Sequence, residues 1–195
     1  MGHYRRLEQV LKDYPKEVIL KDGTGVTLRP LKPEDEEALV DMFKGFSEDE
    51  LWFMNHDLSD PAVIHTWIKH LDLSRVISIV AFLEGRIIAN AALMMKKFGA
   101  KSHIGKLRIS VAPSFREKRL GTWMLLDLSN LAMAIGLQML VMRLVSDRDA
   151  PAIKGVKKLG FVEKALLKDY VLDREENPHD IVIMTKRLAV EWDDF

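Results

Sequence analysis

The fold is decided by one stretch of the chain, Ile109-Ser110-Val111-Ala112-Pro113-Ser114-Phe115-Arg116-Glu117-Lys118-Arg119-Leu120-Gly121-Thr122. It predicts a β-strand, a cationic turn and the start of a helix. The first amides of a helix have no acceptor within the helix and carry partial positive charge. Three cationic side chains add charge to this turn, and Gly121 lets a ligand approach the backbone. The stretch is therefore typical of an anion site, and the alternative is a solvated basic turn.

The residues after this turn predict alternating helices and strands. The expected segments are a helix over 120–135, a strand over 138–145, a helix over 150–159, and strands over 161–172 and 181–185. Asp149 stands where the second helix needs an N-cap. Gly136 and Gly160 stand where the two helices need C-caps. The strand, helix and strand over 103–145 therefore predict a βαβ crossover with a parallel strand pair.

The residues before the turn predict hairpins and short helices. The expected strands cover 17–20, 25–28, 76–83, 86–95 and 103–111, and the expected helices begin near Pro33, Ser47 and Asp60. Ser47 and Glu50, three residues apart, form a capping-box pattern at the second of these helices. Asp22-Gly23 and Glu84-Gly85 are turn formers, so each joins its flanking strands as a hairpin. Together the segments predict a mixed sheet covered on both faces by helices.

The composition indicates one globular domain without a strong overall electric field. The 195 residues include 29 basic and 29 acidic side chains, so nothing attracts nucleic acid or an anionic membrane at long range. The absence of Cys excludes disulfides, thiol nucleophiles and Cys-ligated zinc. No segment reaches the ~18 uninterrupted apolar residues of a membrane span, and residues 1–21 lack a signal peptide's apolar stretch. We expect a cytoplasmic protein that binds neither nucleic acid nor membrane.

The decisive turn is similar to the acyl-CoA-binding motif of the GNAT family of N-acetyltransferases, Q/R-x-x-G-x-G/A between a strand and a long helix. Arg116 matches its first position and Gly121 its last, while Arg119 occupies the middle glycine position. The resemblance extends in order over roughly residues 25–188. Its other parts are Val26-Thr27-Leu28-Arg29-Pro30-Leu31, which looks like the opening strand, Pro33-Glu34-Asp35, which looks like the first helix, and the signature Lys158-Leu159-Gly160-Phe161.

The resemblance implies an α/β (α+β) fold. We expect a mixed, mostly antiparallel twisted sheet of about seven strands, with helices on both faces and a central splayed parallel strand pair. Residues 1–24 would form an N-terminal extension with the first hairpin strand, residues 25–188 the N-acetyltransferase domain, and residues 189–195 a C-terminal tail. The family contains many dimers, so a homodimer stays open, although the sequence identifies no interface.

The resemblance also implies that acetyl-CoA is the cosubstrate and lies between the splayed strands. Ile109 and Val111 would offer main-chain groups to its pantetheine, and the turn would bind its pyrophosphate. The residues expected to bind the cofactor are Ile109, Val111, Arg116, Glu117, Lys118, Arg119, Leu120, Gly121, Thr122 and Asp149. We expect no metal site, because His65 and His70 would lie about 140° apart around a helix.

Catalysis by direct attack of an amine needs a proton acceptor and a proton for the leaving thiolate. Relatives often place a Glu in the strand before the turn, but residues 103–108 contain no carboxylate, and they often place a Tyr where this chain has Val156. His103 is the nearest candidate base, and Tyr170 is a candidate acid. The alternatives are a surface histidine and a structural hydroxyl.

The acceptor is expected to be a primary amine of a small molecule or a protein. Candidates for contacting it are Trp52, Phe53, Asn55, His56 and Asp57, with core packing of Trp52 as the alternative. His179, paired with Asp180, is a candidate general base near the cleft. The alternative is that these are two ordinarily solvated loop residues. The sequence thus predicts an N-acetyltransferase, and the other hypothesis is a non-catalytic acyl-CoA-binding sensor or regulatory domain.

Overall fold

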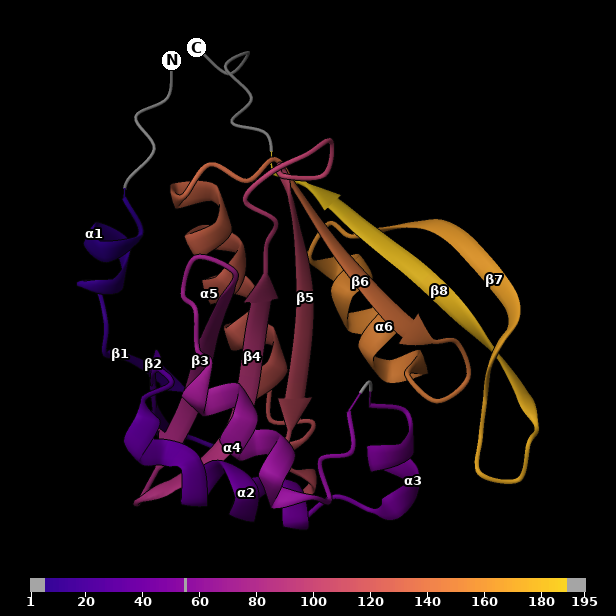
Figure 1. Ribbon diagram of the computed structural model, residues 1–195, viewed down its shortest axis with the longest axis horizontal. Coiled ribbons are helices and arrows are strands. Elements are labelled where there is room, and N and C mark those ends of the chain that lie inside the picture. Colours follow the sequence, from indigo (N-terminus) through magenta and orange to yellow (C-terminus); the bar gives the residue numbers. More distant parts are fainter. Residues whose placement is uncertain (1–5, 55, 189–195) are drawn as a thin grey trace.

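The computed structural model describes residues 6–54 and 56–188 of the chain (Figure 1). The helices are α1 (Leu7–Leu11), α2 (Glu36–Lys44), α3 (Glu48–Trp52), α4 (Pro61–Lys69), α5 (Leu120–Ala134) and α6 (Ala150–Lys158), with 3-10 turns η1 (Pro33–Asp35) and η2 (Pro113–Phe115). The strands are β1 (Lys16–Ile19), β2 (Gly25–Pro30), β3 (Val76–Leu83), β4 (Arg86–Met94), β5 (Ile104–Val111), β6 (Met139–Val145), β7 (Val162–Leu172) and β8 (Pro178–Arg187). Among these described residues, no helix is both long and apolar enough to cross a membrane.

All eight strands form one sheet in the order β1-β2-β3-β4-β5-β6-β8-β7. Every neighbouring pair is antiparallel except β5 and β6, which α5 joins as a parallel crossover. The predicted mixed sheet with a central parallel pair is therefore confirmed, with one strand more than the approximate count of seven. The expected hairpins are also present as β1–β2 and β3–β4.

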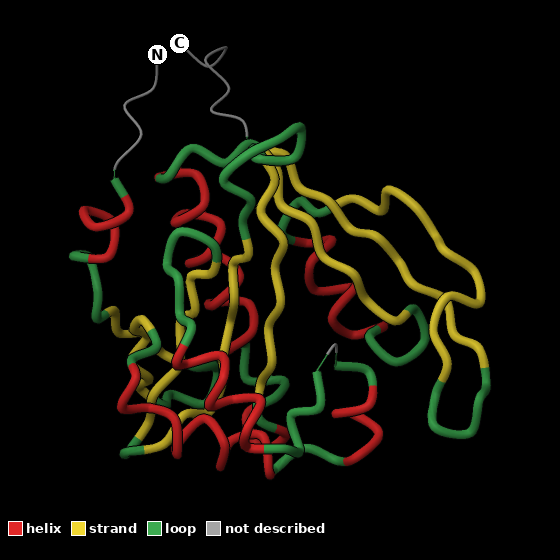
Figure 2. The backbone as a smooth tube through the Cα atoms, in the orientation of Figure 1, coloured by secondary structure: helices red, strands yellow, loops and turns green. Residues whose placement is uncertain are grey.

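Helices pack on both faces of this sheet, as Figure 2 shows. Side chains from α5 and α6 bury the larger core, which includes Met124, Leu128 and Val156. Side chains from α2 and α4 bury a second core that includes Phe43 and Ile64 against β3 and β4. The apolar residues of each helix recur at helical spacing, so one stripe faces the sheet and the rest stays polar.

The N-terminal segment packs onto the rest of the domain. Val10 and Leu20 belong to the larger core, and β1 is hydrogen-bonded to β2. Buried Asp127 of α5 accepts a hydrogen bond from the hydroxyl of Tyr14 and lies 2.6 Å from Lys16 Nζ. Burial, together with the bond to Asp127, raises the pKa of Tyr14 above its ordinary value, so the hydroxyl stays a donor. The division at residue 24 stays a prediction, and the expected tail over 189–195 lies outside the described residues.

β5 and β6 separate after a short paired segment. Their parallel register holds for three pairs, from Ile104↔Met139 to Lys106↔Val141. Beyond these pairs β5 continues beside β4 and β6 continues beside β8. The two strands diverge below their paired upper ends in Figure 1. The predicted splay is thus present, and facing main-chain groups on both strands lack ladder partners.

Gly105 lies at the paired end of this splay, where the core allows no side chain. A Cβ there would lie 2.6 Å from Leu93 Cδ1, 2.9 Å from Leu137 Cδ1 and 3.1 Å from Leu140 Cδ2. Such distances require neighbouring core side chains to move. The close packing of three leucines around this glycine fixes the point at which β5 and β6 meet.

We expect Gly105→Val to lower the free energy of unfolding by about 1–3 kcal/mol, because overpacking forces side chains from their preferred rotamers. Gly155→Ala is the control, since nothing lies within 4 Å of its added Cβ on α6. That change should stabilise the protein by about 0.5–1 kcal/mol through helix propensity. Urea unfolding measures both, and a Gly105→Val variant as stable as the wild type would contradict the packing described.

Candidate functional site

The turn between β5 and α5 adopts a conformation that glycine usually supplies. Arg119 is the N-cap of α5, with φ of 67° and ψ of 9°, and Glu117 has φ of 60°. A non-glycine residue in this left-handed region costs roughly 1–2 kcal/mol. Arg119 stands at the middle glycine position of the motif and still adopts the left-handed conformation.

The start of α5 offers hydrogen-bond donors that find no acceptor among the residues described by the structure. The N-cap makes no side-chain hydrogen bond, and the first turn carries no acidic residue. The amides of Leu120, Gly121 and Thr122 lie in that first turn. A Cβ on Gly121 would meet Val111 Cγ2 at 3.7 Å, an ordinary contact, so the glycine is not required by the protein's own packing. The site is chemically suited to an anion close to the backbone.

Two of the three turn cations have carboxylate partners within the chain. Arg116 forms an ion pair with Glu50 of α3, and Lys118 Nζ lies 2.8 Å from Asp22. The hydrogen bond from Lys118 is the main cause that lowers the pKa of Asp22 to about 2. Within the described residues, the Arg119 side chain has no ion-pair or hydrogen-bond partner. An anion at this turn would therefore meet one unpaired cation and the helix amides.

The main chain of β5 points toward the opening between the splayed strands. The carbonyl of His103 bonds to the start of β6, whereas the amide of Ala112 bonds to β4. Because main-chain groups alternate sides along a strand, those of Ile109 and Val111 face β6. Arg116 Nε donates to the Val111 carbonyl at 3.1 Å, so one of these groups already has a partner.

Asp149 acts at the other side of this opening. It occupies the N-cap position of α6 but makes no side-chain cap, which corrects the expected capping role. Its Oδ2 instead accepts from the Val145 amide at 2.7 Å. The Ser146 amide bonds to β8, so the Val145 amide points toward the splay and needs another acceptor. Burial raises the pKa of Asp149, because the charged form is desolvated.

The two predicted catalytic residues do not come together. His103 precedes β5 at the paired end, about 26 Å along the strand from Val111, and no side-chain partner is found for it among the described residues. Tyr170 is 54% exposed on the edge strand β7, and β6 and β8 separate it from β5. Val156 is buried in the larger core, so it offers no hydroxyl where relatives often have one. Both catalytic assignments stay predictions.

Helix α3 connects the two sides of the splayed pair. Its Glu50 holds Arg116 after β5, while the indole of Trp52 donates to the Leu172 carbonyl of β7 at 2.8 Å. Glu48 forms an ion pair with Arg174 of the β7–β8 hairpin. Sequence patterns showed the capping box of Ser47 and Glu50, which is confirmed, but not these long-range contacts.

A hollow of about 390 Å³ lies beside α3. It is lined by Glu48, Leu51, Trp52, Met54, His56, Asp57, Ser59 and Arg174. Three of the predicted acceptor contacts, Trp52, His56 and Asp57, therefore share one hollow. Asn55 lies outside the described residues. Phe53 instead packs against the ring of His179, with the rings 5.5 Å apart.

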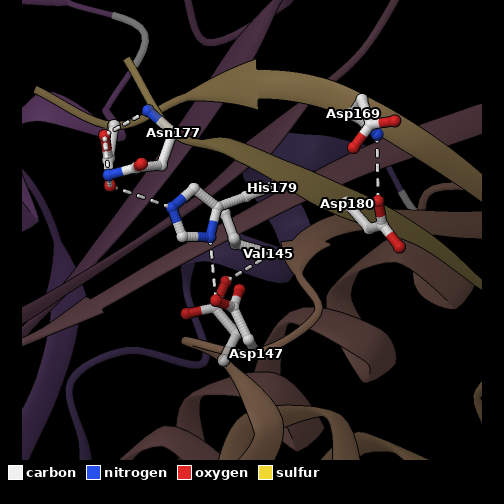
Figure 3. Close-up of polar contacts among 8 residues, drawn as sticks. Val145, Asp147, Asp169, Asn177, His179 and Asp180 are labelled. Carbon is white, nitrogen blue, oxygen red and sulfur yellow. Dashed lines mark hydrogen bonds and ion pairs between the residues drawn. The ribbon is translucent and has the colours of Figure 1, made fainter. Parts of the chain in front are cut away.

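His179 bridges the end of β6 and the β7–β8 hairpin (Figure 3). Its Nδ1 lies 2.8 Å from Asp147 and its Nε2 lies 3.3 Å from Asp173. The bonds to Asp173 and then Asp147 raise the pKa of His179 above its ordinary value. The expected pair with Asp180 is wrong, because Asp180 accepts from the Asp169 amide instead. An imidazole held by two carboxylates favours its charged form, which suits a clamp better than a base.

Together, the mixed sheet, its single separated parallel pair and the following uncapped helix define the acetyltransferase fold class. The sequence profile of the Acetyltransferase (GNAT) family matches residues 36–161. The chain therefore belongs to the GNAT family. No curated protein matches the chain in sequence.

Solved structures with this fold include proteins from several bacteria. A GNAT acetyltransferase from Streptococcus pneumoniae is 23% identical, with a TM-score of 0.73, and the match covers 83% of this chain and 99% of that one. Ribosomal-protein-alanine N-acetyltransferase from Brucella melitensis is 23% identical over 82% and 98%, with a TM-score of 0.72. A putative acetyltransferase from Salmonella typhimurium, solved with its cofactor acetyl-CoA, is 18% identical over 86% and 96%, with a TM-score of 0.72. At these identities the likeness establishes the fold.

We expect Arg119→Val to be less stable than the wild type by about 1 kcal/mol, since a β-branched residue fits the left-handed region poorly. Arg119→Gly removes this strain but increases the freedom of the unfolded chain, so its stability should stay within about 1 kcal/mol of the wild type. Urea unfolding compares the variants. Equal stability of the Val and Gly variants would show that residue 119 does not adopt this conformation in solution.

The contribution of the His179 clamp to stability should fall as pH rises. Below about pH 6.5 the imidazole is charged in both the folded and unfolded chain, so the ion pairs contribute fully. The contribution is lost between that value and the raised folded pKa. His179→Gln should therefore destabilise the protein more at pH 6 than at pH 9, measured by thermal unfolding. The control is His70→Gln, because His70 bonds to the Thr66 carbonyl of α4 rather than to a carboxylate.

Proposed function

We propose that the chain transfers an acetyl group from acetyl-CoA directly to a primary amine. The observation that carries the proposal is the continuous path from the separated strands β5 and β6 to the uncapped start of α5. Main-chain groups without ladder partners lie along the first part of this path, and helix amides lie at its end. An extended amide-containing arm followed by a pyrophosphate has matching hydrogen-bonding groups in the same order.

The cofactor-binding residues would divide into two sets. Ile109 and Val111 would bond to the pantetheine through their main chain. The turn from Arg116 to Thr122 would bind the phosphates, chiefly through the first amides of α5 and the side chain of Arg119. Asp149 would act indirectly, because its carboxylate is already bonded to the Val145 amide.

Acetyl-CoA supplies a thioester carbonyl, which the neutral amine attacks to give an amide and the free thiol. The splayed strands would hold the two reactants in contact and exclude bulk water. Neither β5 nor β6 carries a carboxylate or an imidazole, so these strands offer no base. We infer that water accepts the amine proton, and the leaving thiolate needs little help near neutral pH. His103 and Tyr170 remain candidates for assisting these proton transfers.

A non-catalytic acyl-CoA-binding domain is the second candidate. The buried Val156 and the absence of a carboxylate on β5 favour it. The Brucella relative is named for a protein acceptor, but at 23% identity its acceptor cannot be assigned to this chain. Binding of acetyl-CoA without thiol release for any amine would support this candidate. The cytoplasmic location and the homodimer stay separate predictions.

Thermal unfolding with acetyl-CoA, CoA, ATP and NAD tests the proposal. A ligand at 100 times its dissociation constant stabilises a protein by about 2.7 kcal/mol, and we expect this from the CoA species alone. Gly121→Glu should abolish the stabilisation, because it places a carboxylate at the phosphates. Gly121→Ala is the matched control and should keep binding, since its Cβ makes only an ordinary contact. Stabilisation of Gly121→Glu equal to that of the wild type would rule out this phosphate site.

A further inference from the structure

Two arginines lie on the sheet face opposite α5, on either side of the splay. Figure 1 shows β5, β6 and β8 in front of α5 and α6, while α2 and α4 lie over the lower part of the sheet. Leu107 and Met142 are buried in the core that α5 covers. Side chains alternate along a strand, so the adjacent Arg108 of β5 and Arg143 of β6 point to the opposite face.

The register places these arginines at the same level. Lys106 of β5 pairs with Val141 of β6 in the last parallel pair before the strands separate. Arg108 and Arg143 each lie two residues beyond that pair. They therefore stand opposite one another across the start of the opening, where the proposed reaction needs its acceptor.

Arg108 is a half-buried cation without a counter-charge. Neither it nor Arg143 has an ion pair or a side-chain hydrogen bond with the residues that the structure describes. Burial lowers the pKa of Arg108 from its ordinary value, although an arginine remains charged at neutral pH. Arg29, another partly buried arginine, is by contrast paired with both oxygens of Asp35. A desolvated guanidinium without a partner is unfavourable unless a ligand neutralises it.

The neighbouring positions on this face supply donors rather than acids. The strand positions that share it near the splay are Asn90, Ala92, Met94, Lys106, Ser110, Met139, Val141 and Val145. None of them carries a carboxylate. Asn90 Oδ1 accepts from the Ser78 hydroxyl at 2.5 Å, which leaves its amide hydrogens available to a ligand. The strand positions around the two arginines are therefore suited to an anionic group.

We propose that the acceptor is a free amino acid, whose carboxylate binds Arg108, with Arg143 and Asn90 as further donors. This inference rests on the proposed acetyl transfer. The planar guanidinium matches a carboxylate with two hydrogen bonds and so positions the neighbouring amine at the opening. In the reaction the new N–C bond replaces the C–S bond, the thiolate takes a proton, and the excess proton of the ammonium passes to water.

Matched acceptor pairs test this inference. Thiol release from acetyl-CoA is measured with the twenty common amino acids, and with the primary amines that lack only the carboxylate of leucine, phenylalanine, methionine and lysine. At least one amino acid should exceed its matched amine in kcat/KM by about 10- to 100-fold, the effect of a charge-assisted hydrogen bond. Arg108→Gln should remove that preference, mainly by raising the KM of the amino acid.

Three controls separate the possible failures. Arg86→Gln changes an exposed arginine at the start of β4 and should leave the preference intact. Thermal unfolding should show Arg108→Gln to be at least as stable as the wild type, since it removes an unpaired charge, and the exposed Arg143→Gln gives a second test of the preference. The inference would be overturned if kcat/KM were the same for the amino acid and the amine of every matched pair. It would also be overturned if Arg108→Gln lowered kcat/KM equally for both. Acetyl-CoA binding in the wild type would still support the proposed function in that case.

Discussion

The interruption of one hydrogen-bonded ladder determines the arrangement of the candidate site. β5 and β6 pair at three positions and then separate, although each continues in a ladder with its outer neighbour. Buried main-chain groups without partners are unfavourable, so the separation is stable only where other groups compensate. Asp149 bonds to the Val145 amide on one side, and Arg116 bonds to the Val111 carbonyl on the other. The groups between them remain open to a ligand.

Helix α3 contributes a carboxylate that pairs with one cation of the turn at the end of this opening. Because Glu50 is paired with Arg116, a bound phosphate would compete with a carboxylate that belongs to α3. The same helix is held to the β7–β8 side through Trp52 and Glu48. Phosphate binding at the proposed site would therefore be coupled to the position of α3 through one guanidinium. The neutral overall charge of the chain makes local donors, especially helix amides, the main source of attraction for an anion.

Sequence patterns predicted the parts of this structure that depend on local or periodic signals. The hairpin turns, the capping box of Ser47 and the crossover through α5 follow from residue types at short spacing. The Glu50–Arg116 pair, the His179 clamp and the contact of Tyr14 with Asp127 join residues far apart in the chain, and no spacing rule encodes them. The prediction that Asp149 caps α6 was wrong. The separation of β5 and β6 leaves the Val145 amide without a strand partner, and this amide donates to Asp149 instead.

The absence of a base on the splayed strands and the presence of Arg108 are consistent with one another. A cation near an ammonium group disfavours its charged form and lowers its pKa. In the proposed complex, the acceptor's carboxylate neutralises part of the charge of Arg108 and Arg143, and the remaining positive charge favours the neutral amine. The neutral amine is the form that attacks a thioester. The same two arginines would therefore select the acceptor and reduce the need for a carboxylate base, so the proposed transfer would need no acid on β5.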